Sequence, residues 1–421
     1  MTVDSSKPRL FAWVAGLAVL AALLALPAVA DFGVINVAIK VAIAGVFAMG
    51  FNLLWGQAGL LSFGHAAYFG IGTFASLYAM QAIEAGSRFP TPLVPLVGAA
   101  AGFVCGLVAG WFATMRSGVY FAMITVALAE LVAAVAVKWE SLFGGEGGLR
   151  STRSGWGPFG LQQVSDVYWM TLAWALVAFA VLWWLQRSPL GTVVRGIRER
   201  EVRVSLLGYE THAVKTFVFA ASAGIAGLAG GLLALSDEAA NMVLFQGSSS
   251  AFVVVNTIIG GAGTFLGPVV GAGLTTVFSH YVADLTPFWM LYLGLCFISV
   301  VIYAPAGLAG VLSARWRDAI AGRAPWLTAR EAMVALGVAL LAAGVVFIVE
   351  MVGRLCAPEY GAARLAAGSS WPPVTLLGIA WSPWSLGTLA LPVALLGVGA
   401  WLCRPDRAVA VAALRLKRSS A

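Results

Sequence analysis

Polar side chains that could hydrogen-bond a passing solute gather in one glycine-rich stretch at residues 52–72, NLLWGQAGLLSFGHAAYFGIG. It lies between apolar runs that are long enough to cross a bilayer. Polar groups and irregular backbone are tolerated at membrane depth where protein or a water-filled cavity satisfies them, and glycines let helices approach closely. The stretch therefore predicts a path for a solute. The residues expected to line it are Asn52, Gly56, Gly59, Ser62 and His65.

His65 also has a plainer interpretation, as a packed histidine bonded to a backbone carbonyl, and we favour it over a gating role. Two charged residues, Lys40 and Glu130, fall inside apolar spans. A charge deep in a span costs roughly 2.5 to 3.5 kcal/mol on insertion scales, so such residues usually face the interior. Both fall in the outer half of their spans, and we hypothesise that they pair. The alternative is that Lys40 snorkels toward the outer surface near Asp31.

A second glycine-rich stretch, NTIIGGAGTFLGPVVG at residues 256–271, carries five glycines and a proline. It interrupts a long apolar segment and predicts two shorter helices that meet at a Gly/Pro break. Discontinuous helices can expose backbone to a substrate path, and small residues at spacings of three and four also mark plain helix contact. Both interpretations stay open. The path residues expected here are Asn256, Gly260, Gly261, Gly263 and Thr264.

The two stretches share the spacing N-x-x-x-G-x-A-G, at residues 52–59 and 256–263. If the amino terminus lies inside, both stretches run from the outer side inward. The shared spacing suggests a parallel internal repeat with a site between two halves, while chance in a Gly/Ala-rich chain explains it equally well.

Catalytic chemistry is disfavoured by the distribution of reactive side chains. The three histidines, His65, His212 and His280, are scattered, whereas a membrane enzyme would need clustered His, Asp or Glu near one interface. The four cysteines, at 105, 296, 356 and 403, are also scattered and predict neither a disulfide framework nor a metal site. A secondary transporter would need an ionisable relay at the midplane, and most spans carry no charge.

The elements that must position these residues are membrane-spanning helices. Hydrophobic residues make up 61% of the chain and charged residues 10%, which indicates a polytopic integral membrane protein with an all-α bundle. We expect about 10–12 transmembrane segments. The apolar runs that define them lie near 10–30, 34–55, 66–85, 92–115, 118–137, 168–186, 213–236, 250–282 (the broken one), 288–304, 332–352 and 375–402.

Basic residues orient the chain. With the amino terminus inside, most of the 25 Lys and Arg residues fall in cytoplasmic loops, namely 1–9, the loop at Arg116, 187–215, 315–330 and 404–418. The run at 10–30 is expected to be an uncleaved first helix, since it is longer than a usual signal core, although Ala28-Val29-Ala30 resembles a signal-peptidase site.

The loop that begins at Arg187 predicts a short amphipathic helix on the cytoplasmic surface. Pro189 can start it and Gly208 can stop it. Its charges make one side polar, and four residues supply apolar knobs, so it could fill a groove on a soluble partner; a plain solvated loop is the alternative. The knobs are Val194, Ile197, Leu206 and Leu207.

Five motifs in order resemble one family, the permease subunits of branched-chain amino-acid ATP-binding cassette (ABC) importers of the LivM type. They are NLLWGQAGLLSFGHAAYFGIGTF, SGVYFAMITVALAE, KWESLFGGEGGL, SPLGTVVRGIRERE with SLLGYE, and GGAGTFLGPVVGA, and they run from about residue 34 to 312. The resemblance implies three kinds of partner: a homologous second permease, two cytoplasmic ATP-binding subunits and a periplasmic binding protein. It places the chain as a multi-pass protein of the bacterial inner membrane.

The resemblance also implies that the inner loop, 187–212, is the ATPase-coupling segment. By position, the matching residues are Arg195, Ile197, Arg198, Glu199, Ser205, Leu206 and Gly208. The chain has no G-x-x-x-x-G-K-[ST] phosphate loop, so it is expected not to be an enzyme and to bind no cofactor, with ATP and Mg²⁺ held by partner subunits. Nucleotide closure would pull this loop and reorient the helices around a central path.

Three regions follow from these patterns: a first transmembrane helix at 1–33, the permease core at 34–314 and a carboxyl-terminal extension at 315–421. The extension departs from the family pattern, and its two helices, 332–352 and 375–402, are expected at the periphery. The low charge of the path fits a small neutral or zwitterionic solute. Aliphatic amino acids come first, and urea, short amides or aromatic acids are the alternatives that the same architecture serves.

Overall fold

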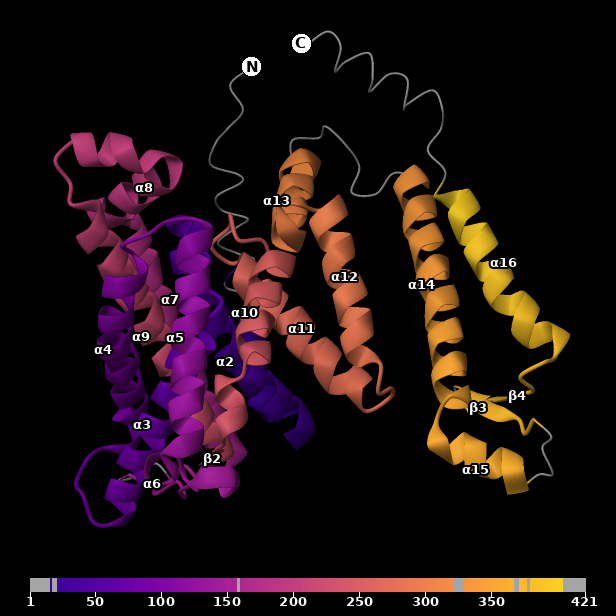
Figure 1. Ribbon diagram of the computed structural model, residues 1–421, viewed down its shortest axis with the longest axis horizontal. Coiled ribbons are helices and arrows are strands. Elements are labelled where there is room, and N and C mark those ends of the chain that lie inside the picture. Colours follow the sequence, from indigo (N-terminus) through magenta and orange to yellow (C-terminus); the bar gives the residue numbers. More distant parts are fainter. Residues whose placement is uncertain are drawn as a thin grey trace, which may run out of the picture. The chain divides into compact units, whose positions relative to one another are not determined.

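Most of the residues that the computed structural model describes are helical (Figure 1). The residues that the structure describes are 16, 21–156, 160–320, 329–366, 371–376 and 379–403. The expected first helix at 10–30 lies largely outside them, although residues 21–29 are helical. The described elements, in chain order, are α2 (Phe32–Asn52), η1 (Leu53–Gln57), α3 (Ala66–Glu84), η2 (Thr91–Leu93), α4 (Val94–Ala113), α5 (Val119–Lys138), α6 (Glu140–Phe143), η3 (Gly145–Gly147), β1 (Leu149–Arg150), α7 (Val164–Arg187), α8 (Pro189–Leu206), α9 (Thr211–Asp237), β2 (Ala239–Ala240), η4 (Met242–Phe245), α10 (Gly247–Gly260), α11 (Gly267–Ala283), α12 (Trp289–Tyr303), α13 (Gly307–Ile320), α14 (Ala329–Leu355), α15 (Pro358–Ala366), β3 (Val374–Leu376), β4 (Ile379–Trp381) and α16 (Leu386–Leu402).

The polytopic all-α bundle is confirmed. Six described helices are long and apolar enough to cross a bilayer, and the pair α12 and α13, bent by 49°, would make a seventh. They are 32–57, 91–113, 119–138, 164–187, 211–237 and 333–355, while α10 and α16 are shorter apolar helices. The expected 10–12 segments also include the run at 10–30, which lies largely outside the described residues, together with α3 and the shorter helices α10, α11 and α16.

The Gly/Pro break is also confirmed, because α10 ends at Gly260 and α11 begins at Gly267. The prediction of one helix over 375–402 is wrong in its first part. Residues 374–376 and 379–381 instead pair as the antiparallel strands β3 and β4, and α16 begins only at Leu386. Short apolar runs do not by themselves distinguish a strand from a helix.

Close packing of α9 against α3 and α4 forms the centre of the bundle. The most hydrophobic stretch of α9 is 83% buried, more than in any other candidate span. Gly227 on α9 faces Gly72 on α3 and both Gly98 and Gly102 on α4, so a Cβ atom at these glycines would meet neighbouring backbone. Small residues at such crossings let helix backbones approach closely within a membrane.

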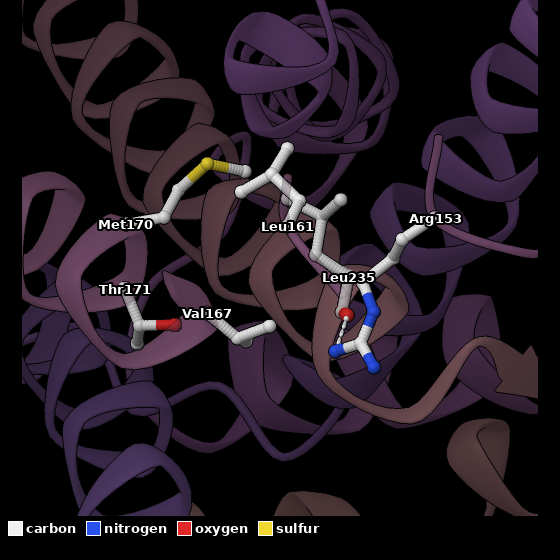
Figure 2. Close-up of a pocket in the computed structure, with 6 residues that line it drawn as sticks. All are labelled: Arg153, Leu161, Val167, Met170, Thr171 and Leu235. Carbon is white, nitrogen blue, oxygen red and sulfur yellow. Dashed lines mark hydrogen bonds between the residues drawn. The ribbon is translucent and has the colours of Figure 1, made fainter. Parts of the chain in front are cut away.

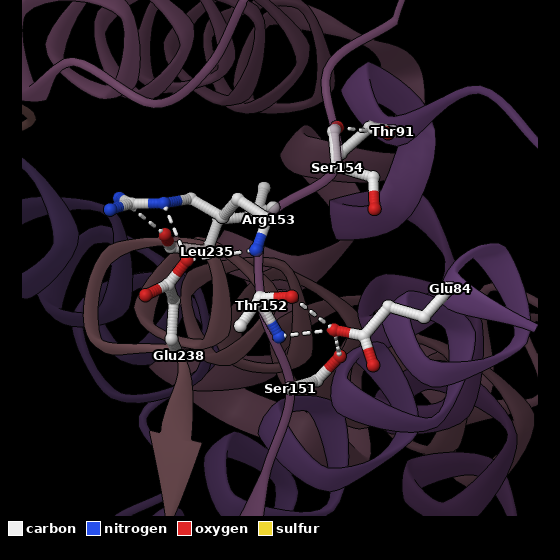
Figure 3. Close-up of polar contacts among 8 residues, drawn as sticks. All are labelled: Glu84, Thr91, Ser151, Thr152, Arg153, Ser154, Leu235 and Glu238. Carbon is white, nitrogen blue, oxygen red and sulfur yellow. Dashed lines mark hydrogen bonds and ion pairs between the residues drawn. The ribbon is translucent and has the colours of Figure 1, made fainter.

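The connection between α5 and α7, which the pattern of basic residues predicts to be the outer one, is held to the bundle by a network of polar contacts (Figure 3). Glu84, the last residue of α3, accepts hydrogen bonds from the Ser151 hydroxyl at 3.1 Å and from the Thr152 backbone and hydroxyl. Glu238, after α9, accepts from the Arg153 backbone at 2.8 Å and pairs with its guanidinium at 3.0 Å. Strand β1 completes the attachment by pairing with β2.

The chain divides into two compact units. One comprises 1–281 and 293–314, and the other comprises 282–292 and 315–421. In the second unit, the Glu350 carboxylate on α14 accepts hydrogen bonds from the hydroxyls of Thr286 and, at 2.9 Å, Tyr292. Helix α14 packs along α16, where Gly337 and Gly399 lie close to the facing helix.

Candidate functional site

Helix α8 begins and ends where its sequence predicts. Ser188 caps it by accepting a hydrogen bond from the Gly191 backbone at 3.3 Å, and Pro189 occupies the first turn. The helix kinks at Arg200, whose backbone is non-helical (φ −155°, ψ 97°). It ends before Gly208, whose φ of +89° lies in the left-handed region that favours glycine.

The apolar side chains of α8 divide between two faces. Val194 and Ile197 are buried against the bundle, so their expected role as partner-facing knobs is wrong. They are three residues apart, and the face they share turns toward the protein. Leu206, at 83% exposed, and Leu207, at 74%, are free for a partner as expected. Val202 and Tyr209 are exposed as well and extend this surface, which we call the α8 apolar surface: Val202, Leu206, Leu207 and Tyr209.

Two side chains, Arg198 and Glu201, fix α8 to the bundle. The Arg198 guanidinium donates to the backbone carbonyl of Gly56 in η1, and its aliphatic stem lies against Gly59. Glu201 forms an ion pair with Lys215 at 2.6 Å and accepts from Thr211 at 3.1 Å, both on α9. A displacement of α8 would therefore be transmitted to η1 and to the inner end of α9.

Arg195 does not contact η1. Its guanidinium donates to the Gln186 carbonyl, at the end of α7, and to the Thr192 hydroxyl, in α8 itself. Two other expected coupling residues, Glu199 and Ser205, are exposed on α8, and the Ser205 hydroxyl bonds its own helix at Val202.

The π-helical turn η1 meets the break between α10 and α11. The Asn52 side-chain amide donates to the Thr264 carbonyl at 3.1 Å, and Gly56 lies against the Ala262 carbonyl. Gly261 adopts a φ of +112°, which only glycine adopts readily. We call this meeting of α8, η1 and residues 261–266 the inner junction. It brings together the two copies of the N-x-x-x-G-x-A-G spacing, which the sequence places about two hundred residues apart.

Most residues expected to line a path are packed within the protein. Asn256 accepts from the Thr275 hydroxyl at 2.5 Å, and the Thr264 hydroxyl donates to the Gly261 carbonyl at 3.0 Å. Gly260 lies directly against Gly267 and Gly271, where a side chain would not fit. Ser62 is fully buried, whereas Gly263 has open space beside it. Their part in solute passage stays a prediction.

His65 is fully buried among the rings of Phe47, Phe51, Tyr68 and Phe219. The Ser222 hydroxyl donates to the Gly50 carbonyl at 2.6 Å, so its oxygen is free to accept from His65 Nε2 at 3.0 Å. The packed interpretation fits this arrangement, although the bonding partner is a hydroxyl and not a carbonyl. His65 thereby joins α2, α3 and α9.

The small cavities do not offer a path in this conformation. One, at the outer end of α7 and α9, is lined by Arg153, Leu161, Val167, Met170, Thr171 and Leu235 (Figure 2). Arg153 Nη1 donates to the Leu235 carbonyl across it at 3.0 Å. Another lies beneath α8, next to Val194 and Val218. Neither has room for an amino acid.

Lys40 and Glu130 do not pair. Lys40 forms its ion pair with Asp237, the last residue of α9, and Glu130 is exposed beside Gly247. Asp237 lies 197 positions from Lys40, and no local pattern connects them. The hypothesis failed because position along a helix fixes depth and leaves the facing direction open.

Comparison with known proteins identifies the family. Residues 33–322 match the family model described as the permease component of branched-chain amino acid transport systems. The chain belongs to this permease family. It is a multi-pass membrane protein and a component of a transport system that contains other subunits.

Two relatives carry the same description, "High-affinity branched-chain amino acid transport system permease protein LivM". The permease is 28% identical to that of Salmonella typhimurium (strain LT2) over 333 residues, which cover 73% of this chain and 76% of the relative. It is 28% identical to that of Escherichia coli (strain K12) over 331 residues, with the same coverage. No solved structure matches.

Sequence reasoning missed Val202 and Tyr209 on the α8 apolar surface. The kink at Arg200 turns the second half of α8, so a single helical period does not predict which side chains are exposed. Sequence reasoning also missed the Glu84 and Glu238 contacts of the outer connection, since these carboxylates are far from residues 151–153 along the chain. The hint in the sequence for these contacts was an acidic residue at the end of each of two helices, Glu84 at α3 and Glu238 after α9.

Proposed function

We propose that this permease forms the transmembrane path of an ATP-driven importer for branched-chain or other aliphatic amino acids. A periplasmic binding protein delivers the solute, a second, homologous permease completes the path, and two cytoplasmic subunits bind ATP and Mg²⁺. The assembly lies in the bacterial inner membrane. Support for the solute class comes from the names of the two relatives and from the low charge of the helices.

The α8 apolar surface is the observation that carries the ATPase partnership. Four exposed apolar side chains on α8 and just after its end, at the basic side expected to be cytoplasmic, would be unfavourable in water and suit a groove on a soluble subunit. The permease itself lacks a phosphate-binding loop, so ATP hydrolysis belongs to that subunit.

The inner junction is the proposed route for the coupled motion. Closure of the ATP-binding subunits displaces α8, Arg198 carries the displacement to η1, and Asn52 carries it to the break between α10 and α11. Discontinuous helices are where alternating-access transporters commonly rearrange around a solute. The packed state of these residues fits one end state of such a cycle.

Affinity purification of the tagged permease from its native membrane, in mild detergent, tests this function. We expect an ATP-binding subunit and a second permease to co-purify, and ATPase activity to rise with binding protein and leucine but not with urea. If urea and not leucine stimulates the ATPase activity, the solute is urea or a similar amide and not an amino acid. A permease that purifies alone, without ATPase activity, would contradict the importer.

A pair of variants tests the docking surface in the same preparation. Leu206→Asp should release the ATP-binding subunits and retain the second permease, because it places a charge in an apolar contact. Leu365→Asp is the matched control, since Leu365 on α15 is 78% exposed and lies outside α8. Equal loss from both variants would argue against α8 as the docking element.

A further inference from the structure

Glu130 is an exposed carboxylate in the middle of a membrane-spanning helix. It lies on α5, about 12 Å from the outer end at Lys138 and about 16 Å from the inner end at Val119, given a helical rise of 1.5 Å per residue. Among the residues that the structure describes, it has no ion pair and no hydrogen bond, unlike Lys40. An uncovered carboxylate at this depth is costly against lipid, so we expect water, solute or another subunit to cover it.

The surroundings of Glu130 are polar toward the start of α10, whereas along α5 they include the exposed apolar side chains of Met123 and Val126. Its carboxylate lies beside Gly247, the first residue of α10, and α10 packs against α5 (Figure 1). Gln246, Gly247 and Ser248 are all exposed there. Ala127, one turn away on α5, is exposed and too short to shield the carboxylate. Glu130 is therefore accessible at the border between this polar stretch and the apolar face of α5.

We propose that Glu130 lines the translocation path and accepts the α-ammonium group of a zwitterionic amino acid as it passes between the permeases. The inference rests on the proposed function and adds a specificity-determining residue to it. A carboxylate is the natural partner for an ammonium group, and a charge-assisted hydrogen bond of this kind is strong where water is scarce. Urea and short amides carry no cation, so the exposed carboxylate favours amino acids as the solute.

A cationic side chain of the second permease is the competing partner for Glu130. Such a contact would cover the carboxylate and would also have to cover the exposed polar stretch 246–248 beside it. Water in a hydrated path would solvate both the Glu130 carboxylate and the polar stretch 246–248. For that reason the solute is the favoured partner.

Water accessibility in the assembled complex is the first test, and it does not depend on transport. Glu130→Cys is introduced where Cys105, Cys296, Cys356 and Cys403 are replaced by serine, and native membranes are treated with a cationic, membrane-impermeant thiol reagent. We expect labelling, and slower labelling with excess leucine and binding protein. Protection of the cysteine in the assembled complex would overturn the proposal in favour of a subunit contact or lipid.

Uptake into proteoliposomes that contain the whole complex is the second test. We expect Glu130→Gln to lower the initial rate of leucine uptake about tenfold, the effect of losing one charge-assisted hydrogen bond, with Glu130→Asp in between. Subunit composition should not change. Glu140→Gln, an exposed carboxylate on α6, is the matched control and should transport normally.

The outcomes distinguish a failure of the Glu130 contact from a failure of the proposed importer. If Glu130→Gln transports leucine at the unsubstituted rate, the ammonium contact is wrong while the importer stands. If Glu130→Gln loses the second permease on purification, Glu130 holds the subunits together and the proposal fails. If the unsubstituted complex imports urea and not amino acids, the proposed solute fails, and the ammonium contact with it.

Discussion

The hydrogen bond with Ser222 determines the tautomer of the His65 imidazole. Its single hydroxyl proton points to the Gly50 carbonyl, which can only accept, so the neutral imidazole carries its proton on Nε2. The Nδ1 lone pair of His65 then has no partner among the described residues. The packed role that the sequence favoured over a gating role therefore fits this conformation, in which His65 links α2, α3 and α9.

Replacing Ser222 with alanine should destabilise the permease by about 1–3 kcal/mol, because it leaves the buried Nε2–H of His65 without an acceptor. The measurement is thermal unfolding of the purified complex in detergent. Ser299→Ala is the control: that hydroxyl bonds only its own helix and is exposed, and its loss should be nearly neutral. A Ser222→Ala protein as stable as the control would show that His65 finds another acceptor.

Arg198→Ala should lower leucine uptake and binding-protein-stimulated ATPase activity about tenfold while the subunits still co-purify, because the link from α8 to η1 is cut. Arg195→Ala is the control, since Arg195 bonds only Gln186 and Thr192 and does not reach η1. Loss of the ATP-binding subunits from Arg198→Ala would instead assign Arg198 to docking.

At the scale of elements, glycines decide how the helices meet. Gly227 lies against backbone of α3 and α4, whereas Gly294, in α12, has open space where a Cβ would be added. Alanine should therefore lower the stability of the protein at Gly227 and be tolerated at Gly294.

Gly227→Ala should lower stability by about 1–3 kcal/mol through overpacking, with a matching fall in expression and in the melting temperature. Gly294→Ala should be neutral or slightly stabilising, because alanine is the better helix former. Detergent melting curves of both variants are the check. A stable Gly227→Ala protein would mean that α4 can move away from α9 at little cost.

Elements were far more predictable than contacts. Apolar runs placed α2, α3, α4, α5, α7 and α9 to within a few residues, since twenty apolar residues in a row have few alternatives. The meeting of Asn52 with Thr264 and of Lys40 with Asp237 depends on how helices rotate and cross. Rotation was not predictable because these helices are apolar on all sides, which removes the amphipathic pattern that identifies a buried face.

At the scale of the whole molecule, the α8 apolar surface, the inner junction and Glu130 all belong to the unit that comprises 1–281 and 293–314. The other unit contains α14, α15 and α16 together with residues 282–292. Within it, the Glu350 carboxylate accepts the hydrogen bonds from Thr286 and Tyr292.

A chain that ends at Ala314 should therefore assemble and import leucine, with a lower melting temperature because Thr286 and Tyr292 lose the acceptor on α14. Uptake assays and melting curves measure the two effects separately. Glu350→Ala in the full chain should reproduce part of the melting shift, and Glu359→Ala, an exposed carboxylate on α15, should not. A folded truncated chain that assembles without transport would give the extension a direct role in the cycle.

The attachment of residues 151–153 to Glu84 and Glu238 has an entropic consequence for the outer face. A free connection of this length would explore many conformations, and any protein that docked on it would have to freeze them at roughly 1–2 kcal/mol per residue. Here folding has already ordered the segment, through contacts from α3 and α9. A protein that docked there would meet a segment already fixed in shape, so less of its interaction energy would be lost to ordering residues 151–153.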